Sequence, residues 1–207
     1  MTVSIVITGY KKWDEYTYPF IQSIFKYATG FKIVCVDLDS QYPDITGVQM
    51  VRHPLTSYAA ALNLGIQAYK ADWYFLANND MRITKPLDAS RFDALDPDSL
   101  YSWVMVDKKT VGREYLESFS MFVPEKIRAS IGMFDENFKP LWFEGADYCF
   151  RAQAAGFKLA APLDRTEWGV YHLEDERDAE RKQIMRDNIE ARHRNRAYLQ
   201  AKHGIVR

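Results

Sequence analysis

The chain has 207 residues, of which 47% are hydrophobic and 27% charged, and its 27 Lys and Arg nearly balance its 28 Asp and Glu. This length fits one domain with a large apolar core, and a formal charge of −1 excludes a general attraction to nucleic acid or anionic membranes. No basic region precedes the short apolar run at the N-terminus, and no apolar stretch approaches the roughly 20 residues of a membrane span. We therefore expect a cytoplasmic protein without a membrane span.

The two cysteines lie in apolar surroundings. Cys35 stands in "IVCVDL" and Cys149 in "DYCFRA", with neither a C-x-x-C motif nor a pair of histidines nearby. These contexts favour buried free thiols in a reducing compartment over a disulfide or a metal site.

The first half of the chain alternates strand patterns with helical ones. Short β-branched or aromatic runs predict strands, and apolar residues at helical spacing predict helices between them. The expected strands are 3–8, 32–37, 48–52 and 73–77, and the expected helices are 15–27 and 57–69, the latter with Ser57 as its N-cap. This alternation favours a mostly parallel sheet with helices on both faces.

The pattern is less regular after residue 80. Pro86 and the stretch 93–98 predict loops. The expected strands are 100–106, 118–123, 158–161 and 168–172, and the expected helices are 124–131 and 144–155, followed by one long helical segment over 176–203. The later strands should extend the sheet in a mixed arrangement.

Polar residues follow three of the predicted strands. Thr8 and Tyr10 end the first, Asp37 and Asp39 end the second, and "NND" at 78–80 ends the fourth. Ligands of open α/β sheets bind outside the carboxyl ends of the strands, although Asn and Asp are also common there because they close turns. The chain has neither G-x-G-x-x-G nor G-x-x-x-x-G-K-[ST], so a bound phosphate would need another source of positive charge.

A divalent metal ion could supply that charge. Asp80 is a suitable oxygen ligand for Mg²⁺ or Mn²⁺, and His172, in "WGVYHLED", is the candidate second ligand because Mn²⁺ accepts an imidazole beside oxygen donors. The alternative is that His172 is a hydrogen-bonded histidine of the core.

Four motifs occur in the order and spacing of a known enzyme family. "VSIVITGYKK" and "VCVDLDS" look like its first two strands, and "HPLTSYAAALNLGIQAYKADWYFLANND" is similar to its block ending in L-N-N-D. "IGMFDENFKPLWFEGADYCFRAQAAGFKL" is similar to its G-x-F-D-E and E-D-x-D-x-x-x-R segment, and "VYHLE" follows where it has a late histidine. Over nearly its full length the chain resembles the GT-A-fold, nucleotide-sugar-dependent glycosyltransferases of family 2.

The resemblance implies an α/β, single-domain GT-A (Rossmann-like) fold over 1–207. Its mostly parallel central sheet would carry helices on both faces and a long C-terminal helix. The nucleotide-binding half would span about 1–80, the acceptor and catalytic half about 81–175, and the C-terminal helix about 176–203.

The resemblance also implies a donor site. Asn78, Asn79 and Asp80 take the place of the D-x-D signature, so Asp80 would bind the metal and Asn78 would lie near the ribose. Asp37 takes the position that contacts the base, with Thr8 and Tyr10 beside it and Asp39 in the same cluster. His172 takes the place of a further ligand of the metal or diphosphate. A UDP-sugar is the expected donor, with Mn²⁺ or Mg²⁺ as cofactor.

The chain departs from the family at the E-D pair, which here reads Glu144-Gly145. The resemblance implies that an acid of this pair acts as the base in inverting members, and the second acid is missing here. Glu144 is our expected base because it begins the predicted helix nearest the rim of the sheet, with Asp147 close behind. Asp147 could instead be a first-turn acid that interacts with the helix dipole. Arg151 is expected to orient this helix by ion pairing.

Two further features bear on the acceptor. Trp142 and Phe143, beside Glu144, form a candidate platform for a sugar or base, with core packing as the alternative. The basic segment 181–207 could bind an anionic acceptor such as DNA or a lipid phosphate. A helix solvated on one face and packed on the other is the favoured alternative.

The sequence thus predicts a metal-dependent, inverting glycosyltransferase. It would move one sugar from a nucleoside-diphosphate sugar to a hydroxyl of a glycan, a protein or a modified nucleobase in DNA. A nucleotidyltransferase of similar fold and a catalytically inactive nucleotide-sugar-binding module are the alternatives, and Gly145 is the evidence for the second. The acceptor and the oligomeric state are not predicted.

Overall fold

The structure is a computed structural model that describes residues 1–10, 12–38, 42–54, 56–160, 162–173, 183 and 186–205. Asp39, one of the predicted donor-site residues, lies outside this set, as do most residues between 174 and 185 of the predicted C-terminal helical segment. No helix among the described residues is long and apolar enough to cross a membrane.

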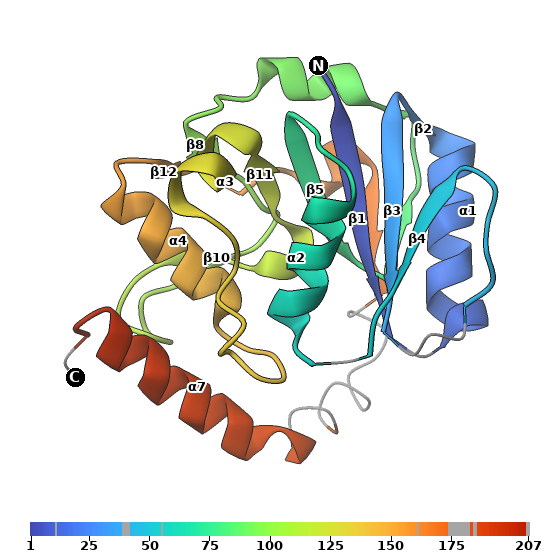
Figure 1. Cartoon of the computed structure of the whole chain (residues 1–207). Helices are drawn as coiled ribbons and strands as arrows, with labels where there is room; N and C mark the ends of the chain where they lie inside the picture. Colours follow the sequence, from blue (N-terminus) through green and yellow to red (C-terminus); the bar gives the residue numbers. More distant parts are fainter. Residues whose placement is uncertain are drawn as a thin grey trace.

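The core of the molecule is a five-stranded sheet in the order β11-β5-β1-β3-β4 (Figure 1). Strands β1 (Val3–Gly9), β3 (Phe31–Asp37), β4 (Val48–Arg52) and β5 (Trp73–Asn78) are parallel, whereas β11 (Phe122–Pro124) pairs with β5 antiparallel. The predicted mostly parallel sheet is confirmed.

The order of the strands places a switch point beside β1. The chain steps outward from β1 to β3 and β4, then returns to the other side of β1 to form β5. The parallel register aligns Thr8 of β1 with Asn78 of β5 at the carboxyl ends of both strands. Connections diverge at this point, which is where ligands of open α/β sheets bind.

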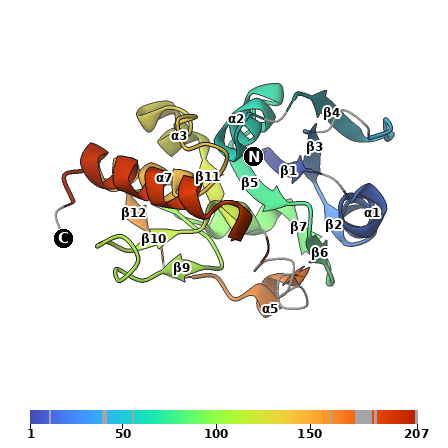
Figure 2. The ribbon, with the colours of Figure 1, turned by 90° about the horizontal axis from the view of Figure 1, so that it is seen from below.

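Helices cover both faces of the sheet, as predicted. Figure 2 shows α1 (Tyr18–Tyr27) and α2 (Tyr58–Ala68) on opposite sides of it. Alternate residues of β1 serve the two faces, because Ile5 belongs to the apolar cluster that contains the α1 residues and Val6 to the cluster that contains the α2 residues. A Cβ on Gly65 of α2 would lie 2.1 Å from Cγ1 of Val6, so this glycine lets the helix sit close against the strand.

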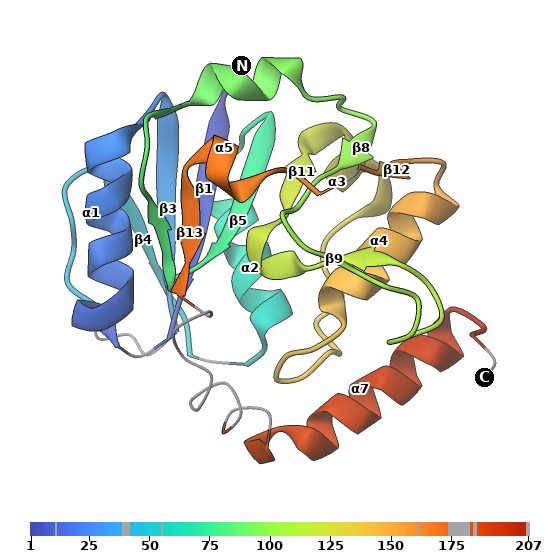
Figure 3. The ribbon, with the colours of Figure 1, turned by 180° about the vertical axis from the view of Figure 1, so that it is seen from behind.

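Short elements complete the fold, and Figure 3 shows β13 and α5 on the face opposite α2. The small sheets pair β2 with β7, β6 with β13, β8 with β12 and β9 with β10. The remaining elements are η1 (Trp13–Thr17), β2 (Ala28–Thr29), β6 (Met81–Ile83), β7 (Leu87–Asp88), η2 (Ala89–Ala94), β8 (Ser99–Leu100), β9 (Met105–Val106), β10 (Tyr115–Leu116), η3 (Ser118–Ser120), α3 (Glu125–Ile131), α4 (Glu144–Ala154), β12 (Lys158–Leu159), α5 (Arg165–Trp168), β13 (Val170–His172) and α7 (Ile189–Lys202).

Several predictions for the second half are wrong in detail. The predicted strand 100–106 exists only at its ends, as parts of β8 and β9, and 118–123 begins with the short helix η3. The predicted strand 168–172 starts only after Gly169, whose φ of 66° ends α5. The predicted long helix is interrupted at Asn188, a residue whose side chain competes with helical hydrogen bonds. These segments pair across long distances in the chain, which local patterns do not record.

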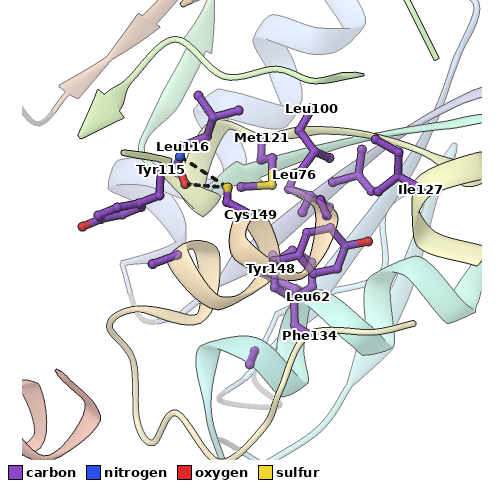
Figure 4. Close-up of a cluster of buried hydrophobic side chains, with 14 of the residues drawn as sticks. Leu62, Leu76, Leu100, Tyr115, Leu116, Met121, Ile127, Phe134, Tyr148 and Cys149 are labelled. Atoms are coloured by element: carbon purple, nitrogen blue, oxygen red, sulfur yellow. Dashed lines mark hydrogen bonds between the residues drawn. The ribbon is translucent and has the colours of Figure 1, made fainter. Parts of the chain in front are cut away.

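Both cysteines are buried and free, which confirms the prediction. Figure 4 shows Cys149 in an apolar cluster with Met121 and Tyr148, and its Sγ accepts a hydrogen bond from the backbone N of Leu116 at 3.3 Å. Burial raises the pKa of each thiol to about 12, so neither is a reactive thiolate at neutral pH.

Candidate active site

Asp80 and His172 lie side by side at the carboxyl edge of the sheet. His172 ends β13, which pairs antiparallel with β6, so that His172 stands opposite Met81. The backbone N of Leu173 donates to the carbonyl of Asp80 at 3.0 Å, which ties the two segments together. The distance from Nε2 of His172 to Oδ1 of Asp80 is 3.2 Å, and the two residues are only 5% and 4% exposed.

This pair suits a divalent cation whose other ligands come from elsewhere. A carboxylate and an imidazole are acceptable donors for Mn²⁺. No third His, Cys, Asp or Glu joins them within the described part of the chain, which leaves room for the phosphate oxygens and water that Mg²⁺ and Mn²⁺ sites often include. The ring of Phe119 stacks on His172 with centroids 4.7 Å apart, which holds the imidazole in orientation.

A hydrogen-bonded cluster surrounds Asn78. Its Oδ1 accepts from the hydroxyl of Tyr58 at 2.8 Å and from that of Thr8 at 3.4 Å. Tyr58 is the first residue of α2, and its place is set by the N-cap Ser57, whose Oγ accepts from the backbone N of Ala60 at 3.0 Å. Motif reasoning missed Tyr58, because nothing in the sequence indicates that it reaches the end of β5.

The hydroxyl of Tyr58 is a neutral donor near two acids. Burial raises its pKa well above 10, and the charges of Glu144 and Asp80 raise it further. The hydroxyl therefore lies within electrostatic range of both the predicted base and the predicted metal ligand.

A second chain of contacts links Asn79 to Asp37. Nδ2 of Asn79 donates to the hydroxyl of Thr17 at 2.9 Å. The Thr17 hydroxyl in turn lies 3.2 Å from the hydroxyl of Tyr42. The backbone N of Tyr42 donates to Oδ2 of Asp37 at 2.8 Å. Asp37 is fully buried, whereas Tyr10, which is also predicted to lie near the nucleobase, is 43% exposed.

Glu144 begins α4 and is 5% exposed. The hydroxyl of Ser118 donates to its Oε1 at 2.9 Å, while Oε2 has no hydrogen-bond partner among the described residues. Burial raises the pKa of Glu144, and Ser118 together with backbone N–H groups at the start of the helix opposes that rise. Ser118 is a second residue that the sequence did not reveal.

Close packing explains why a glycine stands at position 145. A Cβ there would lie 3.0 Å from the N and Cβ of Ser118 and 3.1 Å from the carbonyl oxygen of Leu116. The start of α4 therefore packs directly on the segment that holds Ser118 against Glu144. Gly145, which stands where the second acid of the E-D pair is expected, thus allows a close approach of these two elements.

Asp147, the other predicted base, contacts several basic side chains. It is fully buried, and Nε of Arg151 donates to its Oδ2 at 2.9 Å, as expected from the sequence. Its Oδ1 lies 2.8 Å from both Nζ of Lys202 and Nε2 of His203, so Asp147 joins α4 to α7. Three basic groups occupy its carboxylate.

Trp142 and Phe143 adopt backbone conformations that residues other than glycine rarely use, with φ of 86° and 72°. Phe143 is 7% exposed and belongs to the apolar core, which matches the packing alternative. Trp142 is partly exposed, and the guanidinium of Arg192 lies 5.7 Å from the centre of its ring. Strain of about 1–3 kcal/mol per residue directly before Glu144 is typical of functional sites.

One surface hollow, of about 380 Å³, shares no residue with this site. It is lined by Lys108, Gly112, Arg113, Glu114 and Gln153. Its open, mostly polar character does not match the predicted donor site at the end of β5, and we assign it no function.

Neither a family model nor a curated protein matches the chain. Among solved structures, the chain is similar to the mannosyltransferase PcManGT from Pyrobaculum calidifontis in complex with GDP-Man and Mn²⁺, at 14% identity and a TM-score of 0.58, over 78% of this chain and 55% of that one. It is also similar to GalNAc-T7 with UDP, GalNAc and Mn²⁺, at 12% identity and a TM-score of 0.61, over 76% and 41% of the chains.

A third similar structure is S. aureus TarS 1-349 in complex with UDP, at 14% identity and a TM-score of 0.53, over 81% and 62% of the chains. The chain thus spans between 41% and 62% of the lengths of these three proteins. At such identities the likeness concerns the fold, and this chain has the fold of the GT-A glycosyltransferases.

Proposed function

We propose that the chain is a glycosyltransferase that uses a divalent metal ion and a nucleoside-diphosphate sugar. The observation that carries this proposal is the buried pair of Asp80 and His172 at the switch point of the sheet. Glu144 lies within electrostatic range of the same Tyr58 hydroxyl that contacts Asn78. The similar structures were solved with nucleotide sugars, nucleotides or Mn²⁺, which supports the same ligands here.

The donor would lie along the carboxyl edge of β1, β3 and β5. Asp37 and Tyr10 are the candidates for contact with the nucleobase of the donor. Thr8, Asn78 and Asn79 are the candidates for contact with its ribose and diphosphate. Asp80 and His172 would hold Mn²⁺ or Mg²⁺, which when bound neutralises charge on the leaving diphosphate. A UDP-sugar is the proposed donor, and the two unpaired thiols fit a reducing compartment such as the cytoplasm.

Glu144 is the proposed base of an inverting transfer. The acceptor hydroxyl oxygen forms a bond to the anomeric carbon while the bond from that carbon to the diphosphate oxygen breaks, and the nucleoside diphosphate leaves with the electron pair. The hydroxyl proton passes to Oε2 of Glu144, the oxygen that makes no hydrogen bond with a described residue. We favour Glu144 over Asp147 because three basic groups already hold the Asp147 carboxylate.

The direct test is release of nucleoside diphosphate. The chain would be incubated with a panel of UDP- and GDP-sugars and mixed hydroxyl acceptors, with Mn²⁺, Mg²⁺ or EDTA. We expect release with at least one donor, dependence on the metal, and a loss of about 100-fold or more in Asp80→Asn. The matched control is Asp93→Asn, which changes an exposed carboxylate of η2.

Two outcomes would contradict the proposal. Release that is unaffected by EDTA would remove the roles given to Asp80 and His172. Binding of a nucleotide without release from any donor would instead favour the inactive binding module.

A further inference from the structure

Three buried polar atoms near the start of α4 have no hydrogen-bond partner in the part of the chain that the structure describes. They are Nε1 of Trp142, Nε of Arg192 and Oε2 of Glu144. Leaving one such group unpaired costs about 1–3 kcal/mol, and more when the group is charged. Several of them together indicate a place where a ligand supplies the missing partners.

These side chains come from different elements and meet at one place. Trp142 precedes Glu144 by two residues. The guanidinium of Arg192, from α7, lies over the ring of Trp142, 5.7 Å from its centre. The charges of both Glu144 and Arg192 act on Tyr115 of β10. Burial raises its pKa, the negative charges of Glu117 and Glu144 add to the rise, and the positive charge of Arg192 opposes it.

Figure 4 shows Tyr115 at the margin of its apolar cluster, with the phenol directed away from Cys149 and Tyr148. Its hydroxyl therefore does not point into the interior of the cluster. The guanidinium of Arg192 and the indole of Trp142 thus lie together, and Trp142 stands two residues along the chain from the proposed base.

The other Arg and Lys side chains of α7 already have partners within the fold. Arg194 and Arg196 donate to the carbonyls of Lys139 and Thr110, and Lys202 binds Asp135 and Asp147. These contacts hold α7 in place. The Nε of Arg192 makes no comparable contact with a described residue, so the docking of the helix does not account for it.

We propose that Arg192 and Trp142 bind an anionic group of the acceptor, a phosphate or a carboxylate, and so present the acceptor hydroxyl to Glu144. This inference rests on the proposed function and names its acceptor class. Both Arg192 and Trp142 offer only donors, and phosphate and carboxylate oxygens only accept. An anionic group would form charge-assisted hydrogen bonds with the guanidinium, and an anion placed near Glu144 without Arg192 would be repelled.

The test measures binding of small probes to the full chain. Glycerol 3-phosphate, glycerate and glycerol would be titrated separately, with and without UDP and Mn²⁺, and followed by ligand-observed NMR and calorimetry. We expect saturable binding of at least one anion and none of glycerol. Comparison of the two anions distinguishes a phosphate acceptor from a carboxylate one.

Matched variants assign the effect to the pair. Arg192→Gln should weaken binding of the anion about 10-fold or more, because a charge-assisted hydrogen bond is lost. Trp142→Phe, which keeps a ring but removes the N–H, should weaken it about 3-fold to 10-fold. Arg186→Gln makes the same change of charge at an exposed arginine that bonds only to Gln183 among the described residues, and it should leave binding unchanged.

The outcomes separate this inference from the proposed function. Failure of UDP and Mn²⁺ to bind would contradict the function, whereas anion binding is also measured without them. Three results would overturn the anion site: no saturable binding of either anion, equal binding of glycerol, or anion binding that Arg192→Gln leaves intact.

Discussion

As the proposed base, Glu144 has to meet two demands that conflict. A base must be ionised when the acceptor arrives, but burial favours the neutral acid and raises the pKa of Glu144. Ser118 supplies one hydrogen bond that favours the charged form, and Oε2 remains available for the proton of the acceptor. A raised pKa brings the base closer to working pH, where general-base catalysis is most effective.

Replacement of this acid should separate activity from stability. Glu144→Gln should lower kcat about 10²-fold to 10⁴-fold because the proton acceptor is lost. A raised folded-state pKa means that the protonated carboxyl fits the fold best, so stability is fully present below the unfolded pKa and is lost as pH rises through the folded one. The neutral amide should therefore raise Tm at pH 7 and flatten this dependence. Thermal unfolding from pH 3 to 8 and turnover assays measure both effects.

Glu114→Gln, an exposed acid, is the control for this change and should alter neither quantity. The wild-type activity should also fall on the acid side at a pH above the usual 4.5 of a glutamate. Unchanged turnover in Glu144→Gln would remove Glu144 as the base.

Tyr58 should act by positioning Asn78. Tyr58→Phe removes the 2.8 Å hydrogen bond to Oδ1 and keeps the ring, so the KM for the donor should rise about 3-fold to 10-fold, with a smaller change in kcat. Steady-state kinetics and calorimetry of UDP binding measure this. Tyr69→Phe, at the other end of the same helix, is the control.

A double variant decides whether the two residues act together. If Tyr58 works through Asn78, then Tyr58→Phe should have little further effect on donor affinity in an Asn78→Ala background. Fully additive losses would show that the two residues act independently.

At the scale of elements, α4 owes its position to Gly145. A glycine within a helix normally costs about 1 kcal/mol relative to alanine, so Gly145→Ala would ordinarily stabilise the fold. Here the new Cβ meets backbone atoms of Leu116 and Ser118 at about 3.0–3.1 Å, which cannot move aside cheaply.

Gly145→Ala should therefore destabilise the fold by about 1–3 kcal/mol, as overpacking generally does. It should also lower activity, because Ser118 would shift away from Glu144. Urea unfolding compared with Gln153→Ala, which removes an exposed side chain of the same helix that accepts a hydrogen bond from Arg113, measures the cost. A gain in stability would mean that α4 and η3 pack less closely than these distances of 3.0–3.1 Å indicate.

The docking of α7 depends on the buried Asp147. Removing one partner of a buried ion pair costs about 3–5 kcal/mol, because the remaining charges lose their compensation. Asp147→Asn should lose about this much stability, while the kcat of the folded fraction stays within about twofold of wild type. Urea unfolding and active-site titration give the two quantities.

Asp98→Asn is the control for this change, since it breaks only an exposed pair with Lys126 and should cost under about 1 kcal/mol. The opposite result, normal stability of Asp147→Asn with lost turnover, would make Asp147 the base after all.

For the molecule as a whole, the switch point between β1 and β5 determines where chemistry can occur. Thr8, Asn78 and Asp80 are local to strand ends, but the fold adds His172 from β13 and Glu144 from α4. The proposed site is thus assembled from both halves of the chain. Ligands that bridge these parts should stabilise the entire fold rather than one element.

Binding of UDP with Mn²⁺ should raise the stability of the whole molecule. At a ligand concentration near 100 times Kd the gain is about 2.7 kcal/mol, or about 5–10 °C in Tm for a chain of this size. UDP without metal should give a much smaller shift, as should the complete ligand set with Asp80→Asn or His172→Gln. Differential scanning fluorimetry measures this, with Asp93→Asn expected to behave as wild type. Equal shifts with and without Mn²⁺ would contradict the metal site.

The sequence by itself determined the alternating strands and helices of the first half, the buried cysteines and the polar strand ends. These features follow from local periodicity and composition, which a short window of residues records. The tertiary structure alone decided that Tyr58 reaches Asn78, that Ser118 holds Glu144, that Asp147 binds α7 and that Arg192 meets Trp142. Each of these contacts joins elements far apart in the chain, so its formation depends on how the layers pack and not on any local pattern.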